Sequence, residues 1–192
     1  MTKINISEEI NILTANGYLQ LRYISGFNKS GVVISHSWEN NPVHVRIQSS
    51  CLFSESFGAI DCDCSDQLHS AIREIKIHGG IIIYTYDEGR GIGLENKFRA
   101  ISLQQKNGID TCDAFKKLGF TSDERTFEFA ANALNTVIGI QTPIILMTNN
   151  PNKIEKLRHY GINIIETKKI ICNRPEVISY LKEKELVLGH EF

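Results

Sequence analysis

A change in hydrophobic period close to Cys64 restricts what this chain can fold into more than any other feature of its sequence. Upstream, the segments 17–24, 31–36 and 43–48 are rich in β-branched and aromatic residues, and turn signals such as Asn28 and Asn40-Asn41-Pro42 separate them. That pattern is typical of β-strands joined by short turns. We therefore expect antiparallel strands in the first third of the chain.

Downstream of Cys64, segments with helical spacing alternate with short apolar runs. Leu68, Ala71, Ile72 and Ile75 share one helical face, and Gly79 stands where that helix would end. Next we expect a strand at 80–86, a helix carrying Leu94, Phe98 and Ile101, a helix at about 127–138, a strand at 143–147, a helix opened by Pro151, a strand at 162–166 and a helix at 175–185. Strand–helix alternation after a β-rich start predicts an α+β or mixed α/β fold, in a single domain spanning residues 1–192.

The charge balance narrows the possible ligands. The 192 residues carry 21 basic and 22 acidic side chains, whereas nucleic-acid binders usually carry a basic excess. A few local cations still suffice for a small phosphorylated ligand. The apolar runs at 80–83 and 143–147 are too short to span a bilayer, and the N-terminus lacks the features of a secretory signal. We therefore expect a cytoplasmic protein without nucleic-acid or membrane partners.

Three of the five cysteines stand close together in the sequence, at Cys51, Cys62 and Cys64. In a reducing compartment, closely spaced cysteines more often bind metal than form disulfides. Three thiolates can hold one Zn²⁺ and leave the fourth tetrahedral position open, as catalytic zinc sites do. The alternative is that all five are unconnected buried thiols, and core positions are what we expect for Cys112 and Cys172.

The residues around the cysteine pair favour a site over a core. Asp61 and Asp63 surround Cys62 and Cys64 with polar side chains. A helix beginning near Asp66 would direct the positive end of its dipole toward the thiolates and stabilise their negative charge.

Two turns that follow apolar strands could meet an anion. Residues 87–94 (DEGRGIGL) join a strand to a helix, and Arg90 adds a cation, but Leu94 occupies the position of the third glycine of a dinucleotide fingerprint. In the turn Thr148-Asn149-Asn150-Pro151, Asn is a good N-cap and Pro favours the first helical position. Lys153 opposes the helix dipole there, which points to a ligand, whereas a purely structural role remains open for both turns.

The segment Asp123-Glu124-Arg125 precedes a helix. In an extended conformation Asp123 and Arg125 project to the same side, where they could act as a proton acceptor and an anion clamp. The alternative is a solvated entry to the helix.

Taken together in order, these segments resemble GTP cyclohydrolase II over roughly residues 43–167. The resemblance is carried by Arg46-x-x-Ser49-x-Cys51, Cys62-Asp63-Cys64-x-x-Gln67, Glu88-Gly89-Arg90-x-Ile92-Gly93-Leu94, Asn96-Lys97-x-Arg99-Ala100, Asp110-Thr111, Leu118-Gly119-Phe120, Asp123-Glu124-Arg125 and Thr148-Asn149-Asn150-Pro151-x-Lys153.

The resemblance implies a homodimeric enzyme that converts GTP to a diaminopyrimidine nucleotide, formate and pyrophosphate, the entry step of riboflavin synthesis. It implies one Zn²⁺ per chain on Cys51, Cys62 and Cys64, with hydrolysis beginning at C8 of the imidazole ring. Asp123 matches the proton acceptor, and Arg125 matches the residue at the α-phosphorus; simple phosphate binding suits a protonated guanidinium better than nucleophilic attack. Mg²⁺ would assist at the triphosphate, and the nucleotide contacts would be Arg46, Ile47, Gln48, Ser49, Ser50, Gln67, Glu88, Gly89, Arg90, Thr111, Thr148 and Lys153.

The chain departs from the family pattern at two places. Gln48 and Ser50 stand where the family has His and Glu, and Phe53-Ser54-Glu55 replaces Thr-Gly-Asp. Ile101 takes the place of the active-site tyrosine that the family associates with release of the formyl carbon, and isoleucine has no proton to exchange.

Three functional hypotheses follow from these departures. The first is a cyclohydrolase of this type whose product keeps or loses the formyl group. The second is a related enzyme acting on another purine nucleotide, and the third is a non-catalytic protein that binds zinc and nucleotide.

Overall fold

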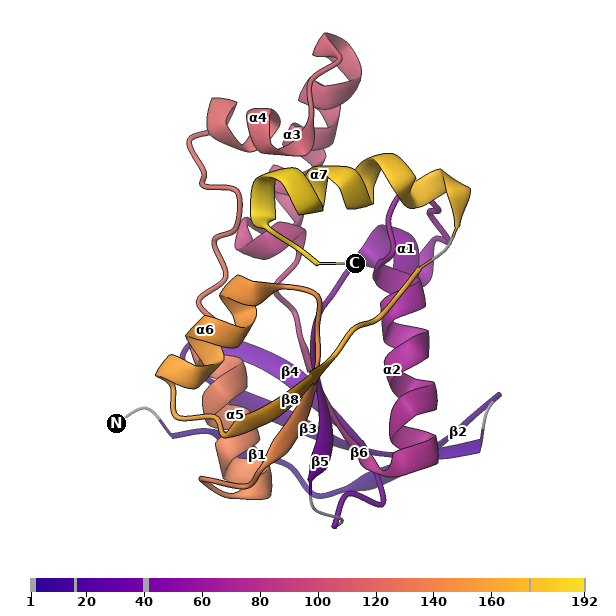
Figure 1. Ribbon diagram of the computed structural model, residues 1–192, viewed down its shortest axis with the longest axis vertical. Helices are drawn as coiled ribbons and strands as arrows, with labels where there is room; N and C mark the ends of the chain where they lie inside the picture. The colour runs from indigo at the N-terminus through magenta and orange to yellow at the C-terminus, as the bar shows by residue number, and fades with distance from the viewer. Residues whose placement is uncertain (1–2, 16, 40–41, 173, 192) are drawn as a thin grey trace.

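The computed structural model describes residues 3–15, 17–39, 42–172 and 174–191, so Asn40 and Asn41 of the expected turn lie outside the described residues. Within these ranges the strands form one eight-stranded sheet in the order β1-β3-β4-β6-β5-β7-β8, with β2 paired to β3. Helices lie on both faces of the sheet (Figure 1). The expected mixed α/β fold is confirmed.

The N-terminal half of the sheet is antiparallel, as the sequence predicted for 17–24 and 31–36, whereas the third segment expected to be antiparallel, 43–48, forms a strand that pairs in parallel. It comprises β1 (Asn5–Ile6), β2 (Ile10–Thr14), β3 (Gly17–Gly26) and β4 (Lys29–His36). The turn between β3 and β4 consists of Phe27 and Asn28, both with positive φ, at 53° and 56°. Two consecutive left-handed residues match the right-handed twist of a hairpin, which explains the tight connection.

The other half of the sheet is parallel and comprises β5 (Val43–Ser49), β6 (Gly80–Thr85), β7 (Ile144–Met147) and β8 (Ile164–Lys168). The chain passes from β5 to β6 through α2 (Cys64–His78) and later returns to the other side of β5 to form β7. The order of the strands therefore reverses at β5. Such a switch point leaves a crevice beyond the carboxyl ends of the strands, where ligands bind in open α/β sheets.

The parallel strands are buried on both faces. Ile81 and Ile83 of β6 pack with α5 (Glu128–Ile138) and with Leu157 of α6 (Pro151–His159), whereas Ile82 packs with Ala71 and Ile75 of α2. Figure 1 shows α2 on one side of the sheet and α5 and α6 on the other. Because successive strand residues face opposite sides, a continuous apolar run such as 80–83 requires a helix on each face.

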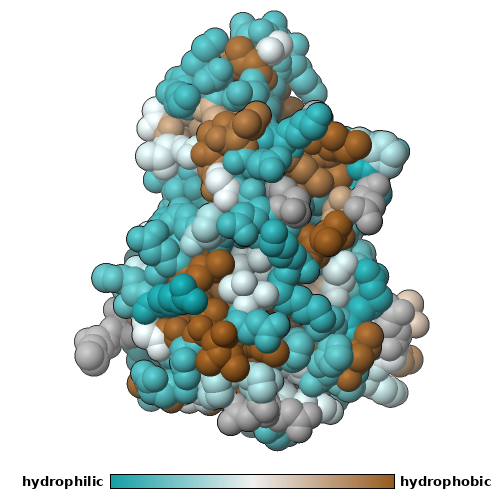
Figure 2. All heavy atoms as spheres, viewed as in Figure 1, coloured by the Kyte–Doolittle hydropathy of each residue, from teal (hydrophilic) through white to brown (hydrophobic). Residues whose placement is uncertain are grey.

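The remaining helices lie at the carboxyl end of the parallel strands, with α7 crossing it and α3 and α4 beyond (Figure 1). They are α1 (Leu52–Ser56), the 3₁₀ turn η1 (Gly89–Gly91), α3 (Gly93–Asn107), α4 (Thr111–Lys117), the 3₁₀ turn η2 (Pro175–Val177) and α7 (Ile178–Leu188). Hydrophobic and hydrophilic side chains both cover the face seen in Figure 2. On α7 the exposed hydrophobic residues are Ile178, Leu186 and Val187.

The sequence predicted the type of the longer elements correctly and missed four short ones: β1, β2, α1 and α4. Their few residues give no clear hydrophobic period, and four of the five residues of β2 are exposed. The helix expected near Asp66 begins at Cys64, and the helix expected at 175–185 divides into η2 and α7. In the described ranges, every helix is too short or too polar to cross a membrane.

Candidate active site

A cavity of about 740 Å³ opens at the carboxyl ends of β5, β6 and β7, where the strand order reverses. Its volume lies within the range of small-molecule sites. The expected site residues that line it are Arg46, Gln48, Ser49, Ser50, Cys51, Cys62, Cys64, Gln67, Glu88, Gly89, Arg90, Ile101, Thr111, Arg125, Thr148 and Lys153. Ile47 instead places its side chain in the core. Asp123 is not among the lining residues, but it hydrogen-bonds to Arg125, which is.

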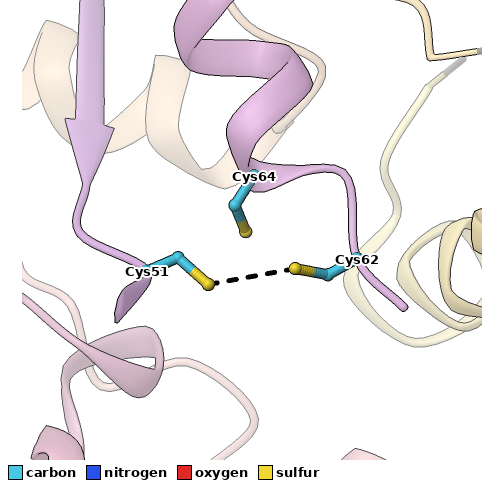
Figure 3. A group of neighbouring side chains, drawn as sticks. All are labelled: Cys51, Cys62 and Cys64. Atoms are coloured by element: carbon cyan, nitrogen blue, oxygen red, sulfur yellow. Dashed lines mark hydrogen bonds between the residues drawn. The ribbon is translucent and has the colours of Figure 1, made fainter. Parts of the chain in front are cut away.

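The three clustered cysteines meet at one wall of this cavity. Cys51 follows β5, Cys62 lies in the loop before α2, and Cys64 is the first residue of α2. Their sulfur atoms all lie within 4.8 Å of one another, and Figure 3 shows them converging from separate stretches of backbone. The Sγ atoms of Cys51 and Cys62 are 3.8 Å apart. Tetrahedral Zn–S bonds of about 2.3 Å would separate two sulfurs by about 3.8 Å, so the spacing fits a shared metal and is too long for a disulfide.

The charge on this cluster also favours a cation. Hydrogen bonds from Cys62 and then Cys64 lower the pKa of Cys51, so one thiolate forms readily. The same contacts with Cys51 raise the pKa values of Cys62 and Cys64. Three adjacent thiolates therefore need a positive ion to compensate their mutual repulsion. The N-terminus of α2 lies at Cys64, which adds the favourable helix dipole expected from the sequence.

Lys97 of α3 lies directly beside the cluster. Its Nζ is 3.3 Å from the Sγ of Cys51 and 2.6 Å from a carboxylate oxygen of Glu88. The second Glu88 oxygen accepts a hydrogen bond of 2.8 Å from the backbone N–H of Leu52. Sequence reasoning gave Lys97 no role, although it lies one helical turn before Ile101 and so shares its face.

A second wall of the cavity is built from buried cations. Arg46 and Lys153 are each about 5% exposed or less, and Arg125 lies near both. Burial lowers the pKa of Arg46 to about 10, and burial together with the charges of Arg46 and Arg125 lowers the pKa of Lys153 well below its ordinary value. Lys153 donates a hydrogen bond of 2.9 Å to the carbonyl of Ile47, so Ile47 contacts a site residue through its backbone. Cations gathered in a cavity at such a cost suit a polyanionic ligand.

In the segment before α5, the side chains of Asp123 and Arg125 lie together, as expected for residues that project to the same side. Both carboxylate oxygens of Asp123 accept hydrogen bonds from the Arg125 guanidinium, at 2.8 and 2.6 Å. Burial alone would raise the pKa of Asp123, but Arg125 outweighs it and holds the pKa below its ordinary value. Arg125 also donates to the hydroxyl of Ser49, at 3.3 Å. The pair is a carboxylate and a cation at neutral pH, held at the end of β5.

The glycine-rich turn after β6 has a left-handed backbone that presents Arg90 to the cavity. Arg90 itself has φ 55°, and a Cβ on Gly91 would come within 3.1 Å of the backbone of Glu124. The Arg90 side chain lies between the rings of Phe115 and Tyr180, with Glu183 of α7 at 3.5 Å. The glycines therefore serve a close backbone approach as well as the cavity.

The departures from the family pattern near Cys51 are coupled to one another. The amide of Gln48 accepts from Arg46 at 3.0 Å and donates to Glu55 at 3.1 Å. Glu55 also accepts a hydrogen bond of 2.5 Å from the hydroxyl of Tyr84, and burial raises its pKa. Two residues that differ from the family thus form one hydrogen-bonded unit beneath the cysteine cluster.

Ile101 and Thr111 line the cavity from the side of α3 and α4. Ile101 is partly buried, and its position on the same face as Lys97 directs an apolar side chain into the cavity. The hydroxyl of Thr111 accepts a hydrogen bond of 3.0 Å from Gln104.

Sequence reasoning also missed the contribution of α7, whose residues Tyr180, Glu183 and Lys184 line the cavity. Its mixed charges read as a solvated face, and no local signal places it over the site. Cys112 is buried as expected, but the prediction of a core position for Cys172 is wrong. Cys172 is partly exposed and hydrogen-bonds to Asp66 at 3.2 Å, because the chain turns there toward η2.

Comparison with known proteins gives consistent matches. The sequence model of the family described as GTP cyclohydrolase II matches residues 8–169. A Thermotoga maritima protein named Riboflavin biosynthesis protein RibBA is 45% identical over 79% of this chain, but the match covers 38% of that relative. A GTP cyclohydrolase-2 of Buchnera aphidicola is 40% identical over 86% of this chain and 85% of its own length. A GTP cyclohydrolase-2 of Haemophilus influenzae is 37% identical over 99% of this chain and 90% of its own length.

Proposed function

The chain belongs to the GTP cyclohydrolase II family and is an enzyme of that type, and from this premise we propose that it opens the imidazole ring of GTP by hydrolysis and releases pyrophosphate. The expected product is an aminopyrimidine ribonucleotide that has lost or kept the formyl carbon. The observation that carries this proposal is the convergence of three cysteine sulfurs on a cavity that also holds buried cations.

In this proposal Cys51, Cys62 and Cys64 hold one Zn²⁺ per chain, since their spacing and donor type suit that ion. A bound Zn²⁺ would supply Lewis-acid chemistry and hydroxide near neutral pH. Lys97 places a positive charge beside Cys51 and offsets part of the negative charge that three thiolates bring.

The cations of the cavity bind the triphosphate. Lys153, Arg125 and Arg90 are available for its oxygens, with Mg²⁺ sharing the charge. Arg125 acts through binding, because its guanidinium stays protonated and is a poor nucleophile. Asp123 is ionised at neutral pH and serves as the proton acceptor, with Arg125 fixing its orientation.

The test is turnover of GTP by the purified, zinc-loaded protein in the presence of Mg²⁺. We expect pyrophosphate release and a nucleotide product whose mass shows that the imidazole ring has opened. Cys62→Ser should abolish both, whereas Cys172→Ser, a cysteine outside the cluster, should leave both unchanged. Nucleotide binding without turnover in the zinc-loaded protein would instead identify a non-catalytic binding protein.

The residue at 101 favours a product that retains the formyl group. Ile101 lines the cavity at the position where the family has a tyrosine, and its side chain can neither donate nor accept a proton. Ring opening would then proceed without stoichiometric formate. Formate in a one-to-one ratio with pyrophosphate would contradict this part of the proposal.

A second substrate class is favoured by the hydrogen-bonded pair Gln48 and Glu55, which changes the loop beside the phosphate-binding residues. Comparing turnover of GTP, GDP, GMP and the adenine nucleotides separates the two possibilities. A strong preference for GTP excludes the alternative. We also propose that the enzyme is a homodimer, which light scattering in solution would check.

A further inference from the structure

The C-terminal helix α7 contributes to the cavity although it lies beyond the residues that the family model matches, 8–169. Its residue Lys184 is buried, with its side chain 8% exposed. The Nζ of Lys184 lies 2.6 Å from a carboxylate oxygen of Asp63, whose side chain is 1% exposed. The two residues are 121 positions apart in the sequence, so the pair joins distant parts of the chain.

Asp63 stands between two of the clustered cysteines and also contacts Gln67, one of the residues expected to bind the nucleotide. Its second oxygen accepts a hydrogen bond of 2.5 Å from the side-chain amide of Gln67. The amide oxygen of Gln67 accepts in turn from the guanidinium of Arg46. One carboxylate thus joins the cysteine loop, the first turns of α2 and the C-terminal helix.

A second contact ties the C-terminal segment to the same loop. Arg174, just before η2, donates a hydrogen bond of 2.9 Å to the carbonyl of Cys62 and forms an ion pair of 2.5 Å with Asp66 of α2. The C-terminal segment therefore holds the loop on both sides of the cysteine pair. Figure 1 shows this segment passing from β8 along the sheet and over its end into α7.

The buried pair calls for an explanation beyond stability. Taking a lysine and an aspartate out of water is expensive, and an apolar pair of similar size is often at least as stable. Burial opposes the charged form of Lys184, but Tyr180 and Asp63 outweigh it and raise its pKa. Fixed orientation of a loop at a site is a benefit that an apolar pair would not supply.

We propose that Lys184 is a positioning residue: by holding Asp63, it fixes the backbone between Cys62 and Cys64 and the amide of Gln67. The C-terminal helix thereby sets the geometry of both the cysteine cluster and the nucleotide contact. The effect on the nucleotide rests on the proposed function, whereas the effect on the cysteine loop does not.

The first experiment compares Lys184→Met and Lys184→Arg with wild type in GTP turnover. Loss of a residue that supports a ligand-binding side chain typically costs about 10-fold or more, and we expect that cost in KM with little change in kcat. Lys184→Arg keeps the charge and should restore most of the affinity. Glu185→Gln, an exposed charge change on the same helix, should behave as wild type.

Because Lys184→Met leaves Asp63 without its ion-pair partner, a loss of stability has to be separated from a loss of positioning. Ile24→Ala in β3 provides the control, since Ile24 is fully buried in the core and its truncation destabilises the fold without altering the cavity. KM is compared between Lys184→Met and Ile24→Ala at temperatures equally far below the Tm of each variant. Ile24→Ala should retain the wild-type KM.

The second experiment needs neither GTP nor metal. In chelator-treated protein, the rate at which Ellman's reagent labels Cys62 and Cys64 reports how firmly the loop is held. Lys184→Met should label several-fold faster than wild type and faster than Ile24→Ala, while Lys184→Arg stays near wild type. Equal labelling rates in Lys184→Met and Ile24→Ala would overturn the proposal. If wild type itself does not turn over GTP, the proposed function fails, and the labelling rates alone decide the role of Lys184.

Discussion

At the scale of single residues, the cavity holds charges that its burial opposes, and Lys153 shows the conflict most clearly. It stands in the first turn of α6, where the helix dipole disfavours a cation, and it lies near the cations Arg46 and Arg125. Its hydrogen bond to the carbonyl of Ile47 fixes its direction, and Asp123 compensates only part of the effect of burial and of the neighbouring cations. A polyphosphate bound in the cavity would supply the missing negative charge.

Replacing Lys153 should therefore separate stability from binding. Lys153→Met removes a buried cation, so we expect the ligand-free protein to gain about 1 kcal/mol, or about 2–4 °C in Tm. KM for GTP should rise by about 10-fold or more. Lys116→Met, an exposed lysine of α4, is the matched control and should change neither. A lower Tm with unchanged KM would show that Lys153 is a structural residue.

The same lysine gives a pH dependence with a definite sign. Its folded-state pKa is lowered, so between that value and its unfolded value of about 10.4 the unfolded chain binds more protons. The free energy of unfolding of wild type, measured relative to Lys153→Met, should therefore rise with pH across this window. Denaturant titrations at several pH values would measure the difference, and a falling difference would contradict the assignment.

Ile101 carries the second prediction at this scale. Ile101→Tyr places a phenol that can exchange protons on the cavity face of α3, one turn from Lys97. We expect formate release to rise relative to pyrophosphate release in this variant, measured together with product mass. Ile101→Leu keeps an apolar side chain of the same volume and should leave the ratio unchanged. An unchanged ratio in Ile101→Tyr would assign the product to other residues.

At the scale of elements, the turn from β7 into α6 combines a helix cap with the site. The side chain of Asn150 accepts a hydrogen bond of 3.1 Å from the backbone N–H of Lys153, and Pro151 occupies the first helical position. The hydroxyl of Thr148 accepts a hydrogen bond of 3.1 Å from the backbone N–H of Asn150. The capping role expected from the sequence is confirmed, and the same cap sets the direction of Lys153 into the cavity.

Removal of this cap should weaken both the helix and the site. Asn150→Ala is expected to lower the free energy of unfolding by about 1 kcal/mol, because the Lys153 amide loses its acceptor. Asn150→Asp retains a capping oxygen and should recover most of this stability. Urea denaturation measures the difference, and equal stability of the two variants would show that the cap contributes little.

At the scale of the whole molecule, the reversal of strand order at β5 gathers the site. The parallel strands β5, β6 and β7 have their carboxyl ends at Ser49, Thr85 and Met147. These ends lie on the same side of the sheet, so the segments that follow them share one crevice. The cysteine cluster joins the end of β5 to the start of α2 across this crevice. A metal held there would link segments that are otherwise connected through weaker contacts.

Metal removal should accordingly affect the whole fold. Because an ion that binds the folded chain and not the unfolded chain stabilises by mass action, chelation should lower Tm by several degrees. Zn²⁺ should restore the wild-type Tm, and Mg²⁺ at the same concentration should not. Cys62→Ser provides the control, since its Tm should not respond to either ion. A chelator-insensitive Tm in wild type would argue against a metal on these cysteines.

The sequence by itself determined the features that depend on local chemistry. The hydrophobic period identified β3 to β7 and the long helices, because burial of one face or two faces imposes a spacing of its own on each element. Capping rules placed the start of α6, and the short spacing of Cys62 and Cys64 brought two of the three clustered thiols together without any knowledge of the fold. Most of the site residues that the sequence motifs and the family resemblance predicted line the cavity.

Only the tertiary structure decided which distant residues meet. The ion pair of Lys184 with Asp63, the approach of Lys97 to Cys51 and the contact of Glu55 with Tyr84 join segments far apart in the chain. Each of these side chains is compatible with a solvated surface when only its neighbours in sequence are considered. The path of the strands and the packing of α3 and α7 over their ends exclude water from these side chains. The side chains thereby lose most of their conformational freedom.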